Sequence, residues 1–412
     1  MLEAFLSRIE VCERLRSSAA GHYLDGFAEY LARSSYEQLG GRMLLHAAWH
    51  FASWAQSSGI AVAALDEAAL KGFQHHLSSC HCVRPNGGRG KAANVGSRLF
   101  LRYLGRCGVV PAQEDDVPGL HPLVQSFRDW LVVHRGVTEV TVRDYGERIV
   151  PLLNALGDEP RGYQAQNLRD FVLGYAREHN IKTTKYMVTV IRMFLRFLAA
   201  EGKCAAGLEY AIPTFPNWRL STLPRYLPAS DVERVVDACD DSTEVGARDR
   251  AIILLLSRLG LRSGDILGLR LSDIDWAKSS LAVSGKSTWE SELPLTQEVG
   301  DALLTHLRRR PVVDTDKVFL RTRAPIRPLK GPSSVAAIVQ RALERAGVEA
   351  PSQGAHLLRH SAATEMLRQG VSLQDIQTVL RHRSIETTTI YAKVDVRLLK
   401  QIARPWPEMS SC

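Results

Sequence analysis

Two interruptions in an otherwise helical pattern divide this 412-residue chain. The first, residues 111–118, combines prolines with a run of acids, and the second, residues 203–228, contains four prolines that favour extended backbone. Apolar residues recur at helical spacing before and between these interruptions. We therefore expect an all-α module at residues 1–116, another at 117–212, a linker at 213–228 and a mixed α+β domain at 229–412.

Local signals refine this division. In the second module, glycines and prolines separate four predicted helices, at residues 122–134, 139–156, 164–178 and 183–200. Beyond the linker, SLAVSGKSTWESELPLT predicts a β-hairpin that turns near residues 285–288.

The two helical modules also resemble each other in sequence. Three short segments recur in the same order, FAEYL and FRDWL at residues 27 and 127, LKGF and LRDF at 70 and 168, and RLFLRYL and RMFLRFL at 98 and 192. Helical patterning by itself can produce any one such match. Three matches in order favour an internal duplication.

Composition points to a polyanionic partner. The formal net charge is +8, and nucleic acid is the commonest polyanion that basic proteins bind, although a basic soluble enzyme has the same balance. We expect no membrane span, because no apolar run is long enough, and no signal peptide, because the N-terminus is amphipathic. The expected location is the cytoplasm, where the seven scattered cysteines would stay reduced.

One cluster of metal-binding residue types stands out in the first module. The segment HHLSSCHC contains His75, His76, Cys80, His81 and Cys82. Zinc sites usually combine two separated pairs of ligands, and no second pair follows this one. We interpret the segment as a helix end and a loop, and we expect neither a metal nor a cofactor.

The last predicted helix of the second module carries a basic face. Lys185, Arg192 and Arg196 lie seven and four residues apart, so they share one side of that helix. Such a face can follow DNA phosphates. A solvated helix face explains the same pattern equally well.

The α+β domain contains four groups of residues that could act on a phosphodiester. In the first, a helix stops near residue 260, Arg262 follows, and Ser263 can cap the next helix, so the arginine can project into a cleft. In the second, Lys286 lies at the hairpin turn, where it can contact DNA or donate a proton. Alone, either residue would be read as an ordinary surface side chain.

The third group is AHLLRHSAATEML. His356 and Arg359 are three residues apart and therefore share a helix face, where the arginine can hold a phosphate by two hydrogen bonds. We expect His360 to pack inside or to cap.

The fourth group is LRHRSIETTTIYAKV. His382 lies in a helix break, and Ser384 can cap a new helix that carries Tyr391 on its third turn. Arginines can neutralise phosphate oxygens and stabilise a pentacoordinate transition state, so no metal is required. Because its free pKa is about 10, the tyrosine then needs a proton acceptor, and the departing sugar oxygen needs a proton donor.

These motifs, from about residue 227 to 393, resemble the tyrosine recombinases, also called the phage integrase family. The resemblance places the family's six catalytic residues on Arg262, Lys286, His356, Arg359, His382 and Tyr391, the last as the nucleophile. Two positions depart from the family pattern. Arg381 stands where glycine is usual, and we expect it to add positive charge near phosphate. Asp265 stands where glutamate is frequent.

The resemblance implies a site-specific recombinase or integrase that works through a 3′-phosphotyrosine. Residues 117–212 would be its core-binding domain, and residues 1–116 an arm-type or duplicated core-binding-like module typical of mobile elements. The alternatives are a type IB topoisomerase and a non-catalytic DNA-binding regulator derived from an integrase.

The expected partners are double-stranded DNA and sister subunits, as a homo-tetramer or mixed with related recombinases on paired sites. An apolar stripe of Val394, Leu398, Leu399 and Ile402 predicts a C-terminal segment that docks on a neighbouring subunit or on its own domain.

Overall fold

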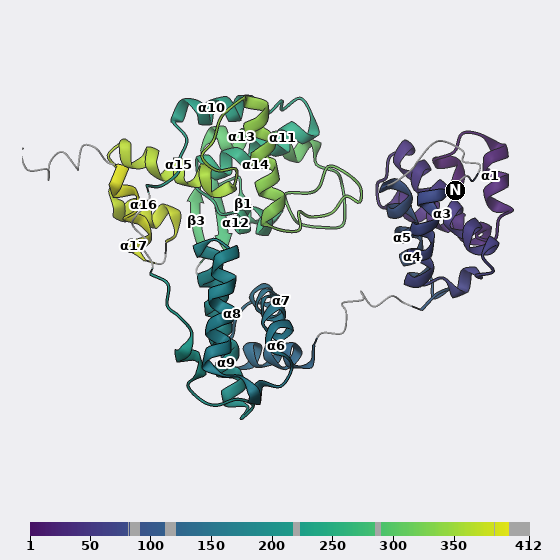
Figure 1. The fold of residues 1–412 in the computed structure, drawn as a ribbon. Helices are drawn as coiled ribbons and strands as arrows, with labels where there is room; N and C mark the ends of the chain where they lie inside the picture. Colours follow the sequence, from purple (N-terminus) through teal and green to yellow (C-terminus); the bar gives the residue numbers. More distant parts are fainter. Residues whose placement is uncertain are drawn as a thin grey trace, which may run out of the picture. The chain divides into compact units, whose positions relative to one another are not determined.

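The structure is a computed structural model that describes residues 1–80, 82, 91–111, 121–216, 223–284, 290–382 and 384–394. Residues Gln113–Arg219 form one compact unit, and Met1–Ala112 with Leu220–Cys412 form the other. Helices dominate, with one small sheet (Figure 1). The predicted fold class, all-α regions followed by a mixed α+β region, is confirmed.

The first part of the chain forms a helical bundle, called here the N-terminal bundle. Its elements are η1 (Leu2–Ala4), α1 (Ile9–Arg16), α2 (Gly21–Arg33), α3 (Gln38–Ser57), η2 (Val62–Ala64), α4 (Glu67–Ser79) and α5 (Lys91–Arg106). Asp66 starts α4 by accepting a hydrogen bond of 2.7 Å from the amide of Ala69. The predicted helix end within HHLSSCHC is confirmed, because α4 ends at Ser79.

The unit Gln113–Arg219 is a second helical bundle, called here the middle bundle. It contains α6 (Pro122–Arg135), α7 (Glu139–Leu156), η3 (Pro160–Gly162), α8 (Ala165–Glu178), α9 (Ile181–Ala200) and η4 (Leu208–Ala211). The four helices lie within two residues of their predicted bounds because their end signals are local. Pro122 occupies the first turn of α6, left-handed Gly136 follows its end, and Asn180 caps α9.

The two bundles share an aromatic core arrangement. Phe27 and Phe100 meet edge to face with ring centroids 5.2 Å apart. Phe127 and Phe194, at the matching positions of the repeated segments, also meet edge to face at 5.2 Å. All four rings are fully buried. The shared geometry supports the predicted duplication.

The second interruption is less extended than its prolines predict. Residues 203–216 include η4, and Ile212 is buried in the core of the middle bundle. The polar and proline content of this segment therefore does not separate it from the helices, because a few apolar side chains suffice to pack it on α9.

The remaining described residues form the C-terminal body. Its elements are α10 (Ala229–Asp237), α11 (Glu244–Ser257), α12 (Ser263–Gly268), η5 (Leu271–Asp273), β1 (Ile274–Asp275), β2 (Ser280–Ser284), β3 (Glu290–Pro294), α13 (Gln297–Arg309), α14 (Pro332–Ala346), α15 (Ala355–Arg368), α16 (Leu373–Leu380), α17 (Ile385–Thr388) and η6 (Tyr391–Val394). The predicted hairpin strands are present, and the antiparallel sheet has the order β1-β2-β3 with Leu281 opposite Leu293.

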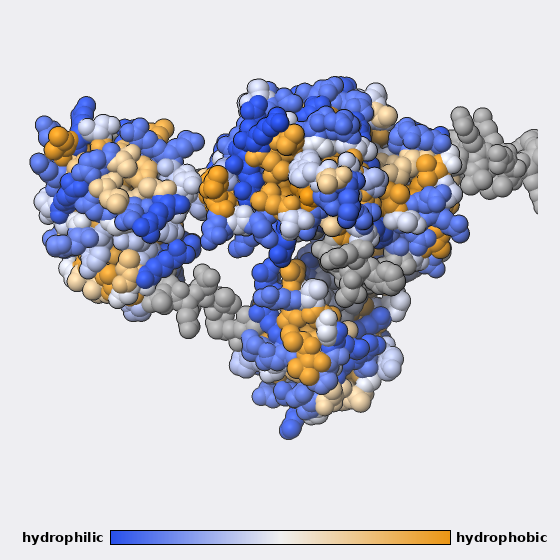
Figure 2. Space-filling view, turned by 180° about the vertical axis from the view of Figure 1, so that it is seen from behind, coloured by the Kyte–Doolittle hydropathy of each residue, from blue (hydrophilic) through white to orange (hydrophobic). Residues whose placement is uncertain are grey.

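Apolar side chains are concentrated in separate cores. In the face drawn in Figure 2, hydrophilic residues cover most of the surface and apolar residues form small groups among them. Within the described ranges, no helix is long and apolar enough to cross a membrane. In the C-terminal body, α11 and α15 belong to the main core, and a small second core surrounds Tyr391.

Candidate active site

The site is organised around Arg359, whose side chain is 3% exposed on α15. Its Nη1 donates to the carbonyl of Gly260 and its Nη2 to the carbonyl of Leu380. Gly260 has a φ of +60°, and a Cβ there would lie 2.5 Å from a methyl carbon of Leu380, so glycine is strongly favoured. One guanidinium thus joins the end of α16 to the segment that precedes α12.

Burial lowers the pKa of Arg359 to about 10, and the neighbouring charge of Arg262 adds to this effect. Arg359 therefore stays protonated at neutral pH. The two carbonyl contacts use two of its five N–H donors and fix the plane of the group.

A cycle of contacts holds a second arginine beside it. Arg262 Nη2 donates to the carbonyl of Arg381 at 2.7 Å, and the Arg381 guanidinium in turn donates to the Asp265 carboxylate. Asp265 also accepts a hydrogen bond of 2.8 Å from the backbone amide of Arg262. The carboxylate thus positions both arginines, which gives a structural role to the residue that replaces the usual glutamate.

The backbone conformation at Arg381 explains why this position usually holds glycine in the family. Its φ is +53°, in the left-handed region that side chains with a Cβ rarely adopt. Its guanidinium forms an ion pair with the buried carboxylate of Asp265. Within the described part of the chain, its Nε and Nη1 are buried without a hydrogen-bond partner. Contact between Arg381 and a DNA phosphate stays a prediction, and it would require these buried donors to become accessible.

The hydroxyl of Tyr391 contacts the ring of a histidine, His360. Tyr391 is 1% exposed, and its hydroxyl lies 2.6 Å from Nδ1 of His360. Burial raises the pKa of Tyr391 to about 12, while the charge of Arg359 acts in the opposite direction. Burial, with His356 and Arg359, lowers the pKa of His360 to about 4. At neutral pH the tyrosine is therefore protonated, the imidazole is neutral, and the two groups share a hydrogen bond.

Two further histidines belong to the same region. His382 Nδ1 lies 2.8 Å from the hydroxyl of buried Thr388, and burial, with the charges of Arg359 and Arg262, lowers its pKa to about 4. His356 lies in the first turn of α15 and is exposed. Partial loss of solvation, with Arg359 and Arg262, also lowers its pKa. Both rings are neutral at pH 7.

The structure corrects three local predictions. Ser263 does not cap α12, because Arg262 is the cap residue and Asp265 supplies the carboxylate. Ser384 does cap α17, but that helix ends at Thr388, and Tyr391 begins the separate turn η6. Consecutive β-branched threonines disfavour a longer helix. His360 neither caps nor merely packs, since it contacts the tyrosine hydroxyl.

Some predicted residues lie outside the described parts of the chain. These are Lys286 at the hairpin turn and the C-terminal segment with Leu398, Leu399 and Ile402, and the same holds for the side chain of Val394. The remaining five catalytic candidates, with Asp265, His360 and Arg381, belong to the C-terminal body. Its position directly after Arg359 could have marked His360 as a site residue. The sequence spacing between His360 and Tyr391 does not predict that they are in contact.

Three of the four basic residues predicted to contact DNA lie on α9, and the segment after that helix contacts each of these three. Arg192 donates to the carbonyl of Ile212 and to the hydroxyl of Thr214, each at 2.9 Å. Lys185 contacts the carbonyl of Pro216, and Arg196 lies 3.9 Å from Glu209. Phosphate contact by these side chains stays a prediction, and it would require them to exchange these partners.

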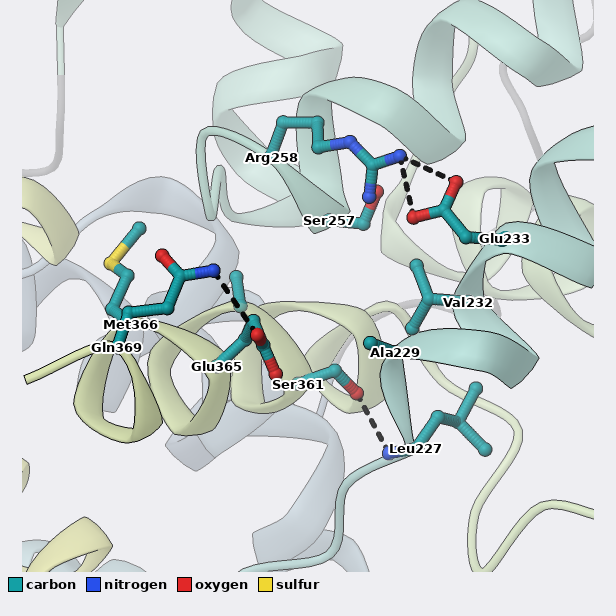
Figure 3. Close-up of a pocket in the computed structure, with 11 residues that line it drawn as sticks. Leu227, Ala229, Val232, Glu233, Ser257, Arg258, Ser361, Glu365, Met366 and Gln369 are labelled. Atoms are coloured by element: carbon teal, nitrogen blue, oxygen red, sulfur yellow. Dashed lines mark hydrogen bonds and ion pairs between the residues drawn. The ribbon is translucent and has the colours of Figure 1, made fainter.

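A separate cavity of about 390 Å³ lies beside α15 (Figure 3). Its lining includes Ser361 and Glu365 of α15 together with Arg258 and Glu233, which form an ion pair of 2.8 Å. None of the predicted catalytic residues lines it. The chemistry therefore has to be sought around Arg359 and Tyr391.

Comparison with known proteins agrees with this geometry. Residues 225–397 match the phage integrase family. A putative integrase/recombinase, y4rA of Sinorhizobium fredii, is 35% identical over 93% of this chain and 94% of its own length. The tyrosine recombinase XerD of Listeria monocytogenes is 28% identical over 69% of this chain and 97% of its own.

Solved structures show the same fold. A lambda integrase dimer bound to a core site has a TM-score of 0.53 at 20% identity, with 71% of this chain and 99% of that chain covered. The XerH recombinase in its post-cleavage complex has a TM-score of 0.54 at 18% identity, with 81% and 93% covered.

With its arginine pair, its histidines and its tyrosine in one body, the chain belongs to the phage integrase family of tyrosine recombinases. It is a site-specific recombinase, and the comparisons do not favour the topoisomerase or the non-catalytic regulator.

Proposed function

We propose that this recombinase cuts and rejoins double-stranded DNA through a covalent 3′-phosphotyrosine at Tyr391. The observation that carries the proposal is the contact of 2.6 Å between the Tyr391 hydroxyl and His360 Nδ1, beside the two carbonyl-anchored arginines. A structural tyrosine needs a hydrogen-bond partner but not a cationic surrounding. This tyrosine has both.

The proposed reaction uses the site as follows. Arg262 and Arg359 bind the non-bridging oxygens of the scissile phosphate and stabilise the charge of the transition state. The Tyr391 oxygen forms a bond to phosphorus, the bond from phosphorus to the 5′ oxygen breaks, and His360 Nδ1 takes the phenolic proton. Lys286 gives a proton to the 5′ oxygen, as the family resemblance implies. Attack by the 5′ hydroxyl of another strand reverses these steps.

The pKa values indicate when the proton moves. With the pKa of Tyr391 raised to about 12 and that of His360 lowered to about 4, the proton stays on the phenol in the resting site. A stable tyrosinate is therefore not present before DNA binds. The proton moves as the bond to phosphorus forms, which keeps the nucleophile inactive away from its substrate.

The wider assembly belongs to the same proposal. We assign residues 1–116 to an additional DNA-binding module, 117–212 to a core-binding domain, 213–228 to a linker and 229–412 to the catalytic domain. Related structures include a lambda integrase tetramer bound to a Holliday junction and a Tn1549 transposon integrase with circular intermediate DNA. They support a tetramer that moves a mobile element. We further propose that the tetramer can be mixed with sister recombinases and that it works in the cytoplasm.

The decisive experiment replaces only the nucleophilic oxygen. Tyr391→Phe should abolish covalent capture of a nicked suicide substrate while DNA binding stays nearly intact. Tyr226→Phe is the matched control. The Tyr226 hydroxyl accepts a hydrogen bond of 2.8 Å from Arg368 and is not part of the site, so this variant should retain capture. A covalent adduct that persists in Tyr391→Phe would sink the assignment.

A second variant tests the proton acceptor. His360→Asn keeps a small polar group near the Nδ1 position but removes a base that can take the proton. Adduct formation should slow by about 10²-fold or more, within the range typical of general-base catalysis. Raising the pH should recover part of the loss, because hydroxide can then remove the phenolic proton. An unchanged rate would leave His360 with a structural role only.

A further inference from the structure

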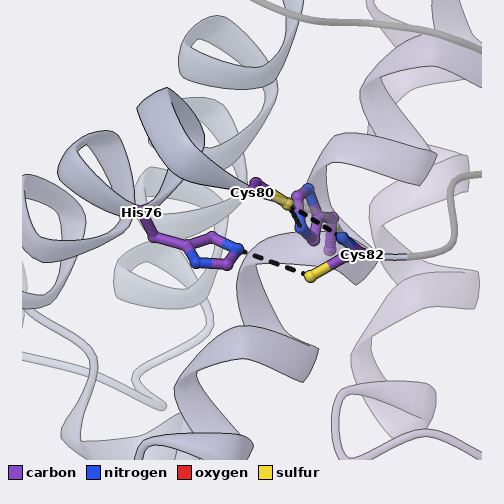
Figure 4. Close-up of side chains that lie close together, drawn as sticks. His76, Cys80 and Cys82 are labelled. Carbon is purple, nitrogen blue, oxygen red and sulfur yellow. Dashed lines mark hydrogen bonds between the residues drawn. The ribbon is translucent and has the colours of Figure 1, made fainter.

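Four side chains in the N-terminal bundle form a cluster that the recombination chemistry does not use. His50 comes from the middle of α3, His76 from the last turn of α4, and Cys80 and Cys82 follow the end of α4. Their four ligand atoms all lie within 4.8 Å of one another (Figure 4). Three of the four residues are half-buried and Cys82 is exposed.

The separations fit one metal ion. Zinc–sulfur bonds of about 2.3 Å and zinc–nitrogen bonds of about 2.0 Å in a tetrahedron place neighbouring sulfur and nitrogen ligands about 3.5 Å apart. Cys80 Sγ lies 3.5 Å from His50 Nε2, and Cys82 Sγ lies 3.5 Å from His76 Nε2. Both rings thus present the same nitrogen to a thiol, in two independent pairs.

We propose that His50, His76, Cys80 and Cys82 form a structural zinc site. Two thiolates and two imidazoles are a complete tetrahedral set, which is typical of structural rather than catalytic zinc. The amide of Cys82 donates to Cys80 Sγ at 3.4 Å, a contact that favours the thiolate over the thiol. His50 also packs its ring against Phe73, with centroids 5.0 Å apart, so the bundle core orients it.

No second ligand pair follows the HHLSSCHC segment in the sequence. The missing ligand lies upstream instead, because α3 packs beside α4 and brings His50 to residues 30 positions later. Zinc would then fasten the end of α4 to the middle of α3. The site lies in a part of the chain that holds none of the catalytic residues, so the proposal does not rest on Tyr391 or its chemistry.

The test uses the full chain, purified under reducing conditions with zinc in the medium and then dialysed. Elemental analysis should find about one zinc per chain, as one tetrahedral site requires. Cys80→Ser and His50→Ala should each lose most of that zinc. Cys107→Ser and His75→Ala, which alter an exposed cysteine and an exposed histidine of the same bundle, should retain it.

Cobalt provides a readout that does not depend on a variant that folds. The wild-type chain, stripped of metal and refilled with Co²⁺, should show the visible bands of tetrahedral cobalt and a thiolate-to-cobalt charge-transfer band. Absence of zinc in the purified chain together with no cobalt spectrum would overturn the proposal. So would equal zinc content in the Cys80→Ser and Cys107→Ser variants.

Discussion

The helical bundles and the C-terminal body bury different kinds of side chain. Among the described residues, the buried side chains with polar groups in the two bundles are Ser97 and Thr184, together with Tyr163, whose hydroxyl donates to the carbonyl of Gly157. The C-terminal body buries arginines and aspartates, and its largest fully buried side chain is Tyr391, whereas seven phenylalanines fill the bundle cores.

The difference shows where each part derives its order. Aromatic cores need only apolar faces that meet, so many sequences can build them. Buried charges need partners in fixed places, and an unpartnered one is costly. The C-terminal body nevertheless buries charged groups around Arg359, because the cations that stabilise a reacting phosphate have to be in position before the phosphate binds.

The largest expected effect comes from removing the central arginine. Arg359→Ala should slow adduct formation by about 10²–10³-fold, since it deletes a preorganised donor to the developing charge. Arg359→Lys should also be slow, because a point charge cannot span the carbonyls of Gly260 and Leu380 as the planar guanidinium does.

Arg258→Ala is the control for this variant. Arg258 pairs with Glu233 and Glu298 outside the site, so its loss should leave cleavage nearly unchanged. Equal slowing of Arg258→Ala and Arg359→Ala in single-turnover cleavage would show that charge loss in general, and not the buried position, controls the rate.

The bundle cores should respond in stability instead. Phe27→Ala and Phe127→Ala should each cost about 3–5 kcal/mol of unfolding free energy, the usual loss for a large buried ring. Hydrogen exchange should place each loss in its own bundle, with α15 unaffected. Phe→Leu at the same two positions should cost less. Unequal losses from the matched pair would weaken the inferred duplication.

Acid should separate the regions further. His306, His360 and His382 of the C-terminal body have folded pKa values near 4, each because of burial. In the unfolded chain the histidine pKa is about 6.5, so the unfolded chain binds more protons than the folded one below that pH. Stability therefore falls as the pH drops from 6.5 towards 4. In the bundles, burial lowers the pKa of His46 in the same direction.

Hydrogen exchange at pH 7 and pH 5 should therefore show a larger loss of protection in α15 than in α9. His306→Gln should reduce that difference, because one of the three titrating groups is removed. His75→Gln, at an exposed position, should not. Equal loss of protection in both helices would contradict the role given to the buried histidines.

The smallest effect concerns the basic face of α9. Arg196→Gln removes a long ion pair of 3.9 Å between an exposed arginine and the largely buried Glu209, and it should change stability by about 1 kcal/mol. If Arg196 moves from Glu209 to phosphate on binding, the salt dependence of DNA affinity should fall by about one counterion. Arg177→Gln, on α8 of the same bundle, is the control. An unchanged salt slope for Arg196→Gln would leave this face outside the DNA contact.

The sequence by itself determined the elements whose causes are local. Helices α6 to α9 follow from apolar periodicity and from end signals such as Pro122, Gly136 and Asn180. The hairpin strands follow from alternation, and the five described catalytic candidates follow from short motifs read through a family resemblance. These patterns hold because neighbouring residues decide helix ends and strand faces.

Only the tertiary structure decided which distant groups meet. Arg359 is held by carbonyls 99 and 21 residues away, and a backbone carbonyl leaves no trace in the sequence. The same applies to His360 against Tyr391 and to His50 against Cys80, whose separations of 31 and 30 residues follow no helical or strand period. Packing of whole helices set those distances, and with them the nucleophile's proton acceptor and the proposed zinc site.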